Sequence, residues 1–208
     1  MLNEPAYQHQ FIPGRSTPRT LLLLHGTGGD ETDLLPLGRA LDRDASILSV
    51  RGNVLENGRN RFFRRLREGV FDEADVARRA QELADFLGAA AQRYEFDLSA
   101  LVAVGYSNGA NITSAMLLLG LAKFAGAILL RPMLPLAEAA LSSLEDQRLF
   151  IGAGEFDPIA TPENVSWLTE TLRRRGADVQ LHVAPAGHEL TSGDVEAARD
   201  WLAGVAIA

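Results

Sequence analysis

The stretch Leu101-Val102-Ala103-Val104-Gly105-Tyr106-Ser107-Asn108-Gly109-Ala110 joins an apolar run to the pattern G-x-S-x-G. Apolar runs without polar alternation are typical of strands buried on both faces of a sheet. Beyond the second glycine, apolar residues recur with helical spacing at Ala110, Ile112, Ala115, Met116 and Leu119. The pattern therefore predicts a tight turn from strand to helix with Ser107 at its apex. Glycines at both flanks remove the collisions that such a turn creates, and the helix N-terminus beneath the serine favours developing negative charge. The alternative is a serine without chemistry in a strand–helix turn.

Short apolar runs alternate with helical patterns along the rest of the chain. The runs predict strands at 20–24, 46–50, 101–104, 127–130, 149–151 and 179–183, and helical spacing predicts helices at 34–41, 73–93, 111–121, 162–175 and 194–205. Such alternation is typical of an α/β fold with a mainly parallel central sheet and helices on both faces. A chain of 208 residues suits a single domain over residues 1–208, with no room for a large lid domain.

Composition excludes several classes of protein. A hydrophobic fraction of 47% with 23% charged residues is that of a globular protein rather than a disordered one. The net charge of −7 gives no electrostatic basis for a nucleic-acid partner, and the absence of cysteine excludes a disulfide framework, a thiolate metal site and a thiol nucleophile.

Residues 112–130 approach the length of a membrane span, but Gly120, Lys123 and Gly126 interrupt them. Because the N-terminus also lacks a signal peptide pattern, we expect a cytoplasmic protein without a membrane partner.

A serine nucleophile needs a general base, and the chain has four histidines. His9 and His25 precede the serine, whereas the triad order of this type of fold is serine, acid, histidine. His182 lies inside a predicted strand, where a packed or partly exposed side chain is expected. His188 follows that strand in Pro185-Ala186-Gly187-His188-Glu189, at the carboxyl end where ligands bind in open α/β sheets. The sequence therefore favours His188 as the base.

The acid that orients the base must come from between these two residues in the chain. Three aspartates are available there, and Asp146 and Asp178 lie at the start of predicted strands, at the wrong end of the sheet. Asp157 instead follows the predicted strand at 149–151, at the carboxyl end. Glu155 is close by and stays open as the alternative acid, although Asp157 is favoured because its position in the loop should reach the histidine better.

A glycine-rich run, His25-Gly26-Thr27-Gly28-Gly29, follows the first long apolar strand. Glycines let backbone amides approach a ligand closely. The amides of Thr27 and Asn108 are therefore expected to stabilise the oxyanion of an ester transition state. A phosphate-binding loop is the alternative, but neither G-x-G-x-x-G nor G-x-x-x-x-G-K-[ST] occurs in the sequence.

Residues 53–72 interrupt the α/β alternation with a long polar stretch that holds five arginines within nine positions. Connections of this length are often functional. Phe62 and Phe63 are adjacent aromatics among these arginines, and we expect at least one of them to line the substrate pocket, with the arginines anchoring the stretch or attracting an anionic substrate. The alternatives are that the aromatics pin the stretch to the body of the protein and that the arginines face water.

These motifs together resemble the phospholipase/carboxylesterase family of α/β hydrolases over nearly the whole chain. The resemblance rests on His25-Gly26-Thr27-Gly28-Gly29-Asp30, the Gly105–Gly109 turn, Asp157 and Gly187-His188. The stretch from Arg51 to Arg65 looks most similar to small bacterial carboxylesterases, including the type associated with hydroquinone handling. The resemblance implies an α/β-hydrolase fold, a triad of Ser107, Asp157 and His188, oxyanion amides from Thr27 and Asn108, no cofactor and frequent homodimerisation.

The sequence predicts a serine carboxylesterase that cleaves small-molecule esters through an acyl-enzyme, with no metal. Thr27 and Asn108 depart from acyl-protein thioesterases, which usually have an apolar residue and a glutamine at these positions. A lysophospholipase or acyl-thioesterase is the alternative within the class, and a hydrolase-fold binding protein without turnover is the alternative outside it. A complete candidate triad argues against the latter.

Overall fold

The computed structural model describes residues 7–67, 69–136 and 142–207. The strands are β1 His9–Ile12, β2 Thr20–Leu24, β3 Ser46–Val50, β4 Val54–Glu56, β5 Arg59–Arg61, β6 Arg65–Arg67, β7 Val70–Phe71, β8 Leu101–Tyr106, β9 Gly126–Leu130, β10 Arg148–Gly154 and β11 Asp178–Ala184. The helices are α1 Leu35–Leu41, α2 Glu73–Tyr94, α3 Asn108–Leu118, α4 Pro162–Arg174 and α5 Ser192–Ala203, with a short 3₁₀ turn at Leu98–Ala100. Every predicted strand and helix is present, with ends that move by a few residues.

A central sheet organises these elements. Within the described residues it has seven strands in the order β1-β3-β2-β8-β9-β10-β11. All neighbours pair in parallel except β1, which pairs antiparallel with β3 at the edge of the sheet. The mainly parallel sheet is therefore confirmed, whereas β1 was not predicted. Its four residues are all half-buried, so the strand lacks the continuous apolar run that identifies the inner strands.

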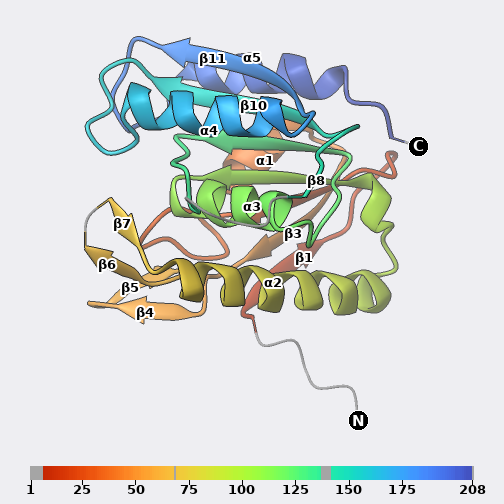
Figure 1. The fold of residues 1–208 in the computed structure, drawn as a ribbon. Coiled ribbons are helices and arrows are strands. Elements are labelled where there is room, and N and C mark those ends of the chain that lie inside the picture. The colour runs from red at the N-terminus through yellow and green to blue at the C-terminus, as the bar shows by residue number, and fades with distance from the viewer. Residues whose placement is uncertain (1–6, 68, 137–141, 208) are drawn as a thin grey trace.

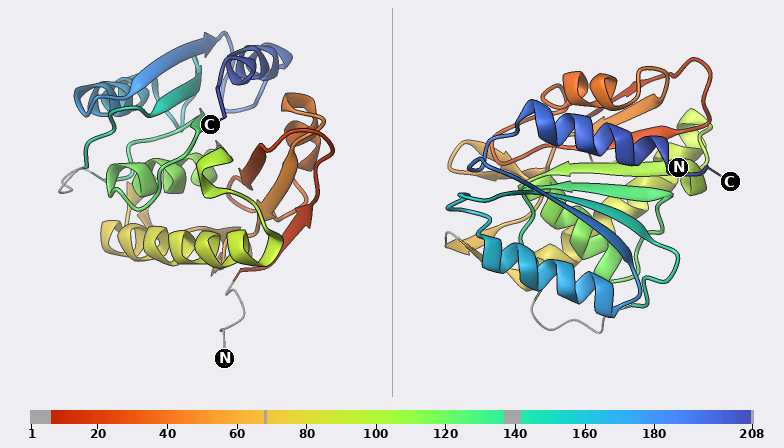
Figure 2. Two further views of the ribbon diagram at one scale, coloured as in Figure 1. Left: turned by 90° about the vertical axis from the view of Figure 1, so that its right-hand side faces the viewer. Right: turned by 90° about the horizontal axis from the view of Figure 1, so that it is seen from above.

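Helices cover both faces of the sheet, as Figures 1 and 2 show. Helices α2, α3 and α4 contribute to one hydrophobic core, and α1 and α5 contribute to the other. Strand β2 explains this division, because successive side chains of a strand point to opposite faces. Leu22 and Leu24 lie in the core with α2 and α3, while Leu21 and Leu23 lie in the core with α1 and α5.

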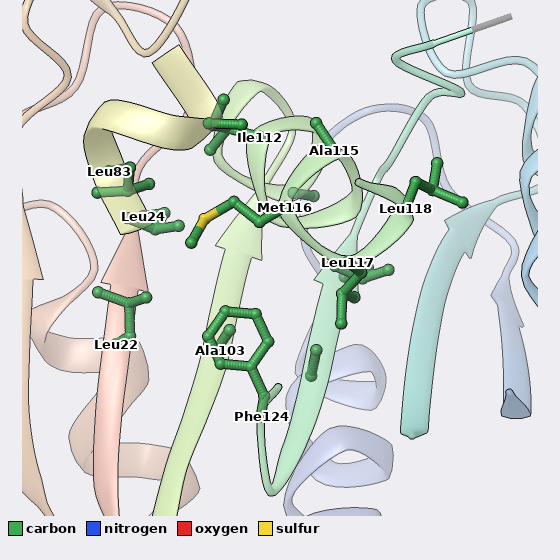
Figure 3. Close-up of a cluster of buried hydrophobic side chains, with 14 of the residues drawn as sticks. Leu22, Leu24, Leu83, Ala103, Ile112, Ala115, Met116, Leu117, Leu118 and Phe124 are labelled. Atoms are coloured by element: carbon green, nitrogen blue, oxygen red, sulfur yellow. The ribbon is translucent and has the colours of Figure 1, made fainter. Parts of the chain in front are cut away.

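Helix α3 packs directly on the sheet and is buried along its entire length. Figure 3 shows Ile112, Ala115 and Met116 above Leu24 and Ala103, with Leu83 of α2 beside them. Because α3 starts one residue after Ser107, this packing fixes the position of the strand-to-helix turn.

Residues 53–72 form two hairpins rather than an irregular excursion. Strands β4 and β5 pair antiparallel, and so do β6 and β7. Asn57 and Gly58 connect β4 to β5, with φ angles of 51° and 73°. Positive φ at both central residues is the backbone of a tight two-residue hairpin turn, for which Asn-Gly is a strong sequence signal.

Among the residues described, no helix is both long and apolar enough to cross a membrane. The apolar stretch at 112–130 is divided between α3 and β9, which are separate buried elements of the fold.

Candidate active site

The turn between β8 and α3 holds Ser107 in a conformation that non-glycine residues rarely adopt. Its φ is 51° and its ψ is −109°. A Cβ on Gly105 would lie 2.6 Å from the backbone of Ala110, and a Cβ on Gly109 would collide with the carbonyl oxygen of Leu24. A side chain at either glycine of the G-x-S-x-G pattern would therefore collide with the neighbouring backbone. With glycine at both positions the turn can form, and it leaves the serine hydroxyl at the carboxyl edge of the sheet.

Hydrogen bonds connect Ser107 to the two other predicted triad residues. His188 Nε2 lies 2.9 Å from Ser107 Oγ, and His188 Nδ1 lies 2.7 Å from Asp157 Oδ2. The Asp157 carboxylate is fully buried, and its other oxygen accepts hydrogen bonds from the amides of Ile159 and Ala160. Glu155, the alternative acid, is exposed. The structure thus brings together the serine, the histidine and the favoured aspartate.

Arg131 holds the loop that carries His188, and sequence reasoning missed it. Its guanidinium is fully buried and donates to the carbonyl oxygens of Gly187 and Glu189, on either side of the histidine. It also forms two hydrogen bonds with the Asp194 carboxylate, at 3.0 and 2.8 Å. Tyr106 adds a further contact, because its hydroxyl donates to the carbonyl oxygen of His188.

Asp194 stabilises the same region from the start of α5. Its carboxylate accepts hydrogen bonds from the amide and hydroxyl of Thr191, which completes a capping box at the N-terminus of the helix. Burial by itself raises the pKa of Asp194, but the hydrogen bonds from Arg131 and Thr191 outweigh it and hold that pKa below its usual range. His182, the rejected base, lies in β11, and its Nε2 is 3.8 Å from this carboxylate rather than near Ser107.

The loop with the predicted oxyanion donor Thr27 is held by the β4–β5 hairpin. The Gly28 amide donates to Asn60 O at 2.8 Å, and the Asn60 side chain donates to Gly29 O at 2.9 Å. The buried Arg61 guanidinium donates to Thr27 Oγ1 at 2.8 Å. These contacts leave the Thr27 amide free of any acceptor among the described residues.

The second predicted donor, Asn108, is fixed by the same stretch. Its side-chain Oδ1 accepts a hydrogen bond from the Phe62 amide at 2.7 Å. Its own backbone amide lies at the start of α3 and has no protein acceptor within the described part of the chain. The arginine-rich stretch therefore supports both predicted oxyanion donors.

Phe62 and Phe63 are placed in the core rather than at the cleft. Both side chains are fully buried in the cluster beneath α2 and α3. Phe62 packs on His25 with ring centroids 4.9 Å apart, and Phe63 packs edge-on against Phe71 at 5.1 Å. Neither is among the residues that line the cleft at Ser107. This placement favours the alternative in which the two aromatics pin the stretch to the body of the protein.

His25 is a buried histidine whose two ring nitrogens both have partners. Nδ1 donates to Gly26 O at 2.6 Å, and Nε2 accepts from the Gly52 amide at 2.9 Å. This pattern requires the neutral imidazole, since a protonated Nε2 would face the Gly52 N–H. Burial lowers the pKa of His25, with the bond to Gly26 opposing the shift.

Acid should therefore destabilise the protein through His25. Because the pKa of the folded state lies below the unfolded value of about 6.5, the unfolded chain takes up the proton first. The contribution of His25 to the free energy of unfolding is complete above pH 6.5. Below that pH it should fall by up to about 1.4 kcal/mol per pH unit. Urea unfolding at pH 7.5, 6.5 and 5.5 measures this, with His25→Asn as the comparison. An identical loss in the two proteins would contradict the assignment.

A cleft of about 710 Å³ opens at Ser107 and His188. Its walls come from the loop at 25–29, the residues before α1, the end of β8, the two hairpins and the loops after β10 and β11: Gly26, Thr27, Gly29, Asp33, Leu34, Arg59, Arg65, Tyr106, Ile159, Glu189 and Leu190. Among the residues described, no cluster of three or more His, Cys, Asp or Glu side chains could hold a metal ion.

Comparison with known proteins identifies the family. No family model matches the chain. "Putative hydrolase MhqD" of Bacillus subtilis (strain 168) is 47% identical over 194 residues, which cover 93% of this chain and 96% of that protein. The chain belongs to the phospholipase/carboxylesterase family of α/β hydrolases. The family predicted from the sequence is thereby confirmed.

Solved structures of carboxylesterases share the fold of this family member. The Bacillus cereus carboxylesterase has a TM-score of 0.93 at 47% identity, covering 96% of this chain and 95% of that one. A carboxylesterase from Mesorhizobium loti has a TM-score of 0.92 at 34% identity, with coverages of 98% and 97%. The chain therefore has the α/β-hydrolase fold and is a hydrolase of the carboxylesterase type. The described residues hold no large lid.

Proposed function

We propose that the protein is a serine carboxylesterase that hydrolyses small carboxylic esters through a triad of Ser107, His188 and Asp157. The observation that carries this proposal is the continuous hydrogen-bonded chain from Asp157 through His188 to Ser107, which ends in an open cleft. A nucleophile, a base within hydrogen-bond reach and a third group that orients the base form the arrangement that activates a serine.

The reaction follows from these contacts in two steps. Ser107 Oγ attacks the ester carbonyl carbon while His188 Nε2 takes the hydroxyl proton, and the proton then passes to the departing alcohol. Water, deprotonated by the same nitrogen, then attacks the acyl carbon of the acyl-enzyme. The bond between that carbon and Ser107 Oγ breaks, and His188 returns the proton to Oγ as the carboxylic acid leaves. Asp157 stays ionised, keeps the proton of the neutral imidazole on Nδ1 and stabilises the imidazolium.

The backbone amides of Thr27 and Asn108 stabilise the oxyanion formed in each step. Both are free of protein acceptors in the described part of the chain, and the Asn108 amide also lies at the positive end of the α3 dipole. A donor of this kind contributes about 3 to 4 kcal/mol to transition-state stabilisation.

Fluorophosphonate labelling combined with an ester series tests the proposal. The protein should bind one equivalent of a fluorophosphonate, and peptide mass spectrometry should locate the adduct on Ser107. p-Nitrophenyl esters of two to twelve acyl carbons should give their highest kcat/KM among the short chains, since a cleft of about 710 Å³ suits a small ligand.

The other classes of function predict different results in the same assay. A lysophospholipase would prefer the longest chains, and an acyl-thioesterase would cleave the matched thioester faster than the oxygen ester. A binding protein without turnover would hydrolyse none of these substrates. An unlabelled Ser107 in folded protein would overturn the proposal.

A further inference from the structure

Arg59 is an exposed cation on the wall of the cleft, next to the loop at 25–29 that holds Thr27. It is the first residue of β5, and its neighbour Asn60 is hydrogen-bonded to Gly28 and Gly29. The Arg59 side chain runs over Gly28, with Cβ, Cγ and Cδ 3.8–3.9 Å from the position of a Cβ built there. Since Gly28 follows Thr27 directly, the hairpin places the Arg59 side chain beside the residue that follows the predicted oxyanion donor.

Of the two arginines that line the cleft, Arg59 and Arg65, only Arg59 has no ion pair with a described carboxylate. Arg65 also lines the cleft, but its Nε lies 3.1 Å from the Glu56 carboxylate. Arg61 is buried against Thr27, and Arg64 pairs with Asp72 at 3.1 Å. The sequence could not rank the five arginines, whereas the structure leaves Arg59 as an exposed cation in the wall of the cleft.

Two carboxylates also line the cleft. Glu189 is already engaged, since its carboxylate accepts a hydrogen bond from the Gly187 amide at 3.2 Å. Asp33 is exposed, packs over Gly29 and forms no ion pair with a described residue. Its charge opposes an anionic ligand, so Asp33 and Arg59 should affect such a ligand in opposite directions.

We propose that Arg59 is a specificity-determining residue that binds a carboxylate of the substrate, so that the preferred esters carry a second, anionic group. This inference rests on the proposed esterase function. A guanidinium presents a fixed fork of N–H donors that matches a carboxylate in two parallel hydrogen bonds. A hydrogen bond to a charged group contributes about 1.5 to 3 kcal/mol. Its loss therefore corresponds to about a tenfold to 150-fold decrease in kcat/KM.

Two pairs of esters test this preference, one for each side of the scissile bond. Monomethyl adipate and its neutral amide, methyl adipamate, vary the acyl side, while 4-acetoxybenzoate and 4-acetoxybenzamide vary the leaving group. Wild type should hydrolyse the anionic member of at least one pair with at least tenfold higher kcat/KM than its neutral partner. Added salt should reduce that ratio, because ions screen exposed charges.

Substitutions then assign the preference to Arg59. Arg59→Gln should lower the ratio of anionic to neutral kcat/KM at least tenfold, and Arg59→Lys should restore only part of it because an ammonium lacks the fork. Asp33→Asn should raise the ratio. Arg67→Gln is the matched control, since Arg67 is an exposed arginine of the same stretch outside the cleft and should leave the ratio unchanged.

The outcomes separate this inference from the proposed function. Ser107 could be labelled normally while Arg59→Gln lowers kcat/KM equally for both members of each pair. That result would support the proposed esterase function and overturn the role of Arg59. A wild-type protein that hydrolyses the anionic and neutral members of each pair with equal kcat/KM would also overturn the role of Arg59. Calorimetry on Ser107→Ala provides a readout without turnover: adding Arg59→Gln should weaken 4-acetoxybenzoate binding at least tenfold, and unchanged binding would overturn the proposal.

Discussion

Replacing Ser107 by alanine should lower kcat for ester hydrolysis by about a millionfold, the size of effect that loss of a serine nucleophile has in a comparable triad. The fold should be retained, because the hydroxyl makes its hydrogen bond with His188 and alanine meets the same backbone requirement at this positive φ. The residual rate would come from the oxyanion donors and substrate binding alone. Steady-state kinetics on p-nitrophenyl acetate and far-ultraviolet circular dichroism measure the two properties.

The combination of variants makes the test more specific. Residues that act as one unit are strongly non-additive, so Ser107→Ala/His188→Ala should be about as slow as either single variant. His182→Ala is the matched control, because His182 lies near Asp194 and not near the serine. It should change packing and leave most of the activity. Turnover by a folded Ser107→Ala protein would exclude Ser107 as the nucleophile.

Removing Arg131 should destabilise the protein by about 3 to 5 kcal/mol, the usual effect of breaking a buried ion pair from one side. Arg131→Met leaves the fully buried Asp194 carboxylate without its partner and removes the two hydrogen bonds that hold the loop around His188. The free energy of unfolding from urea titration measures the effect.

Two further variants distinguish the pair from a general effect of losing an arginine. Arg131→Met/Asp194→Leu replaces both charges and should recover part of the lost stability, since the isolated buried charge is then gone. Arg199→Met breaks an exposed pair, 3.7 Å from Asp200, and should cost at most about 1 kcal/mol. Equal losses in Arg131→Met and Arg199→Met would contradict the importance of the buried pair.

The central sheet could be predicted because its strands are buried on both faces. The residues of β2 are all apolar except Thr20, and each face of the strand packs in a different core. Burial on both faces requires a continuous apolar run, and such a run can be recognised in the sequence. The candidate triad could be predicted for a related reason. Parallel strands end at one edge of the sheet, which brings Ser107, Asp157 and His188 together although they are far apart in the chain.

Features that depend on pairing between distant polar residues could not be predicted in the same way. Arg131 and Asp194 are 63 positions apart, and no periodic pattern connects a buried arginine to its carboxylate. The position of Arg131 directly after a buried strand was a usable signal, since the same edge rule applies to it. The β4–β5 hairpin also had a local signal in Asn57-Gly58, but its short strands and many arginines resemble a solvated loop.

The attachment of the β4–β5 hairpin has a consequence for protein engineering. Asn60 and Arg61 are bonded to the loop at Thr27, while the Phe62 amide is bonded to Asn108 beside the nucleophile. A designer who exchanges residues 53–63 to widen the cleft would therefore also shift the groups that face the oxyanion. The hairpin, the loop at 25–29 and the residue after the nucleophile form one transplantable module, and a chimera should take all three from the same parent.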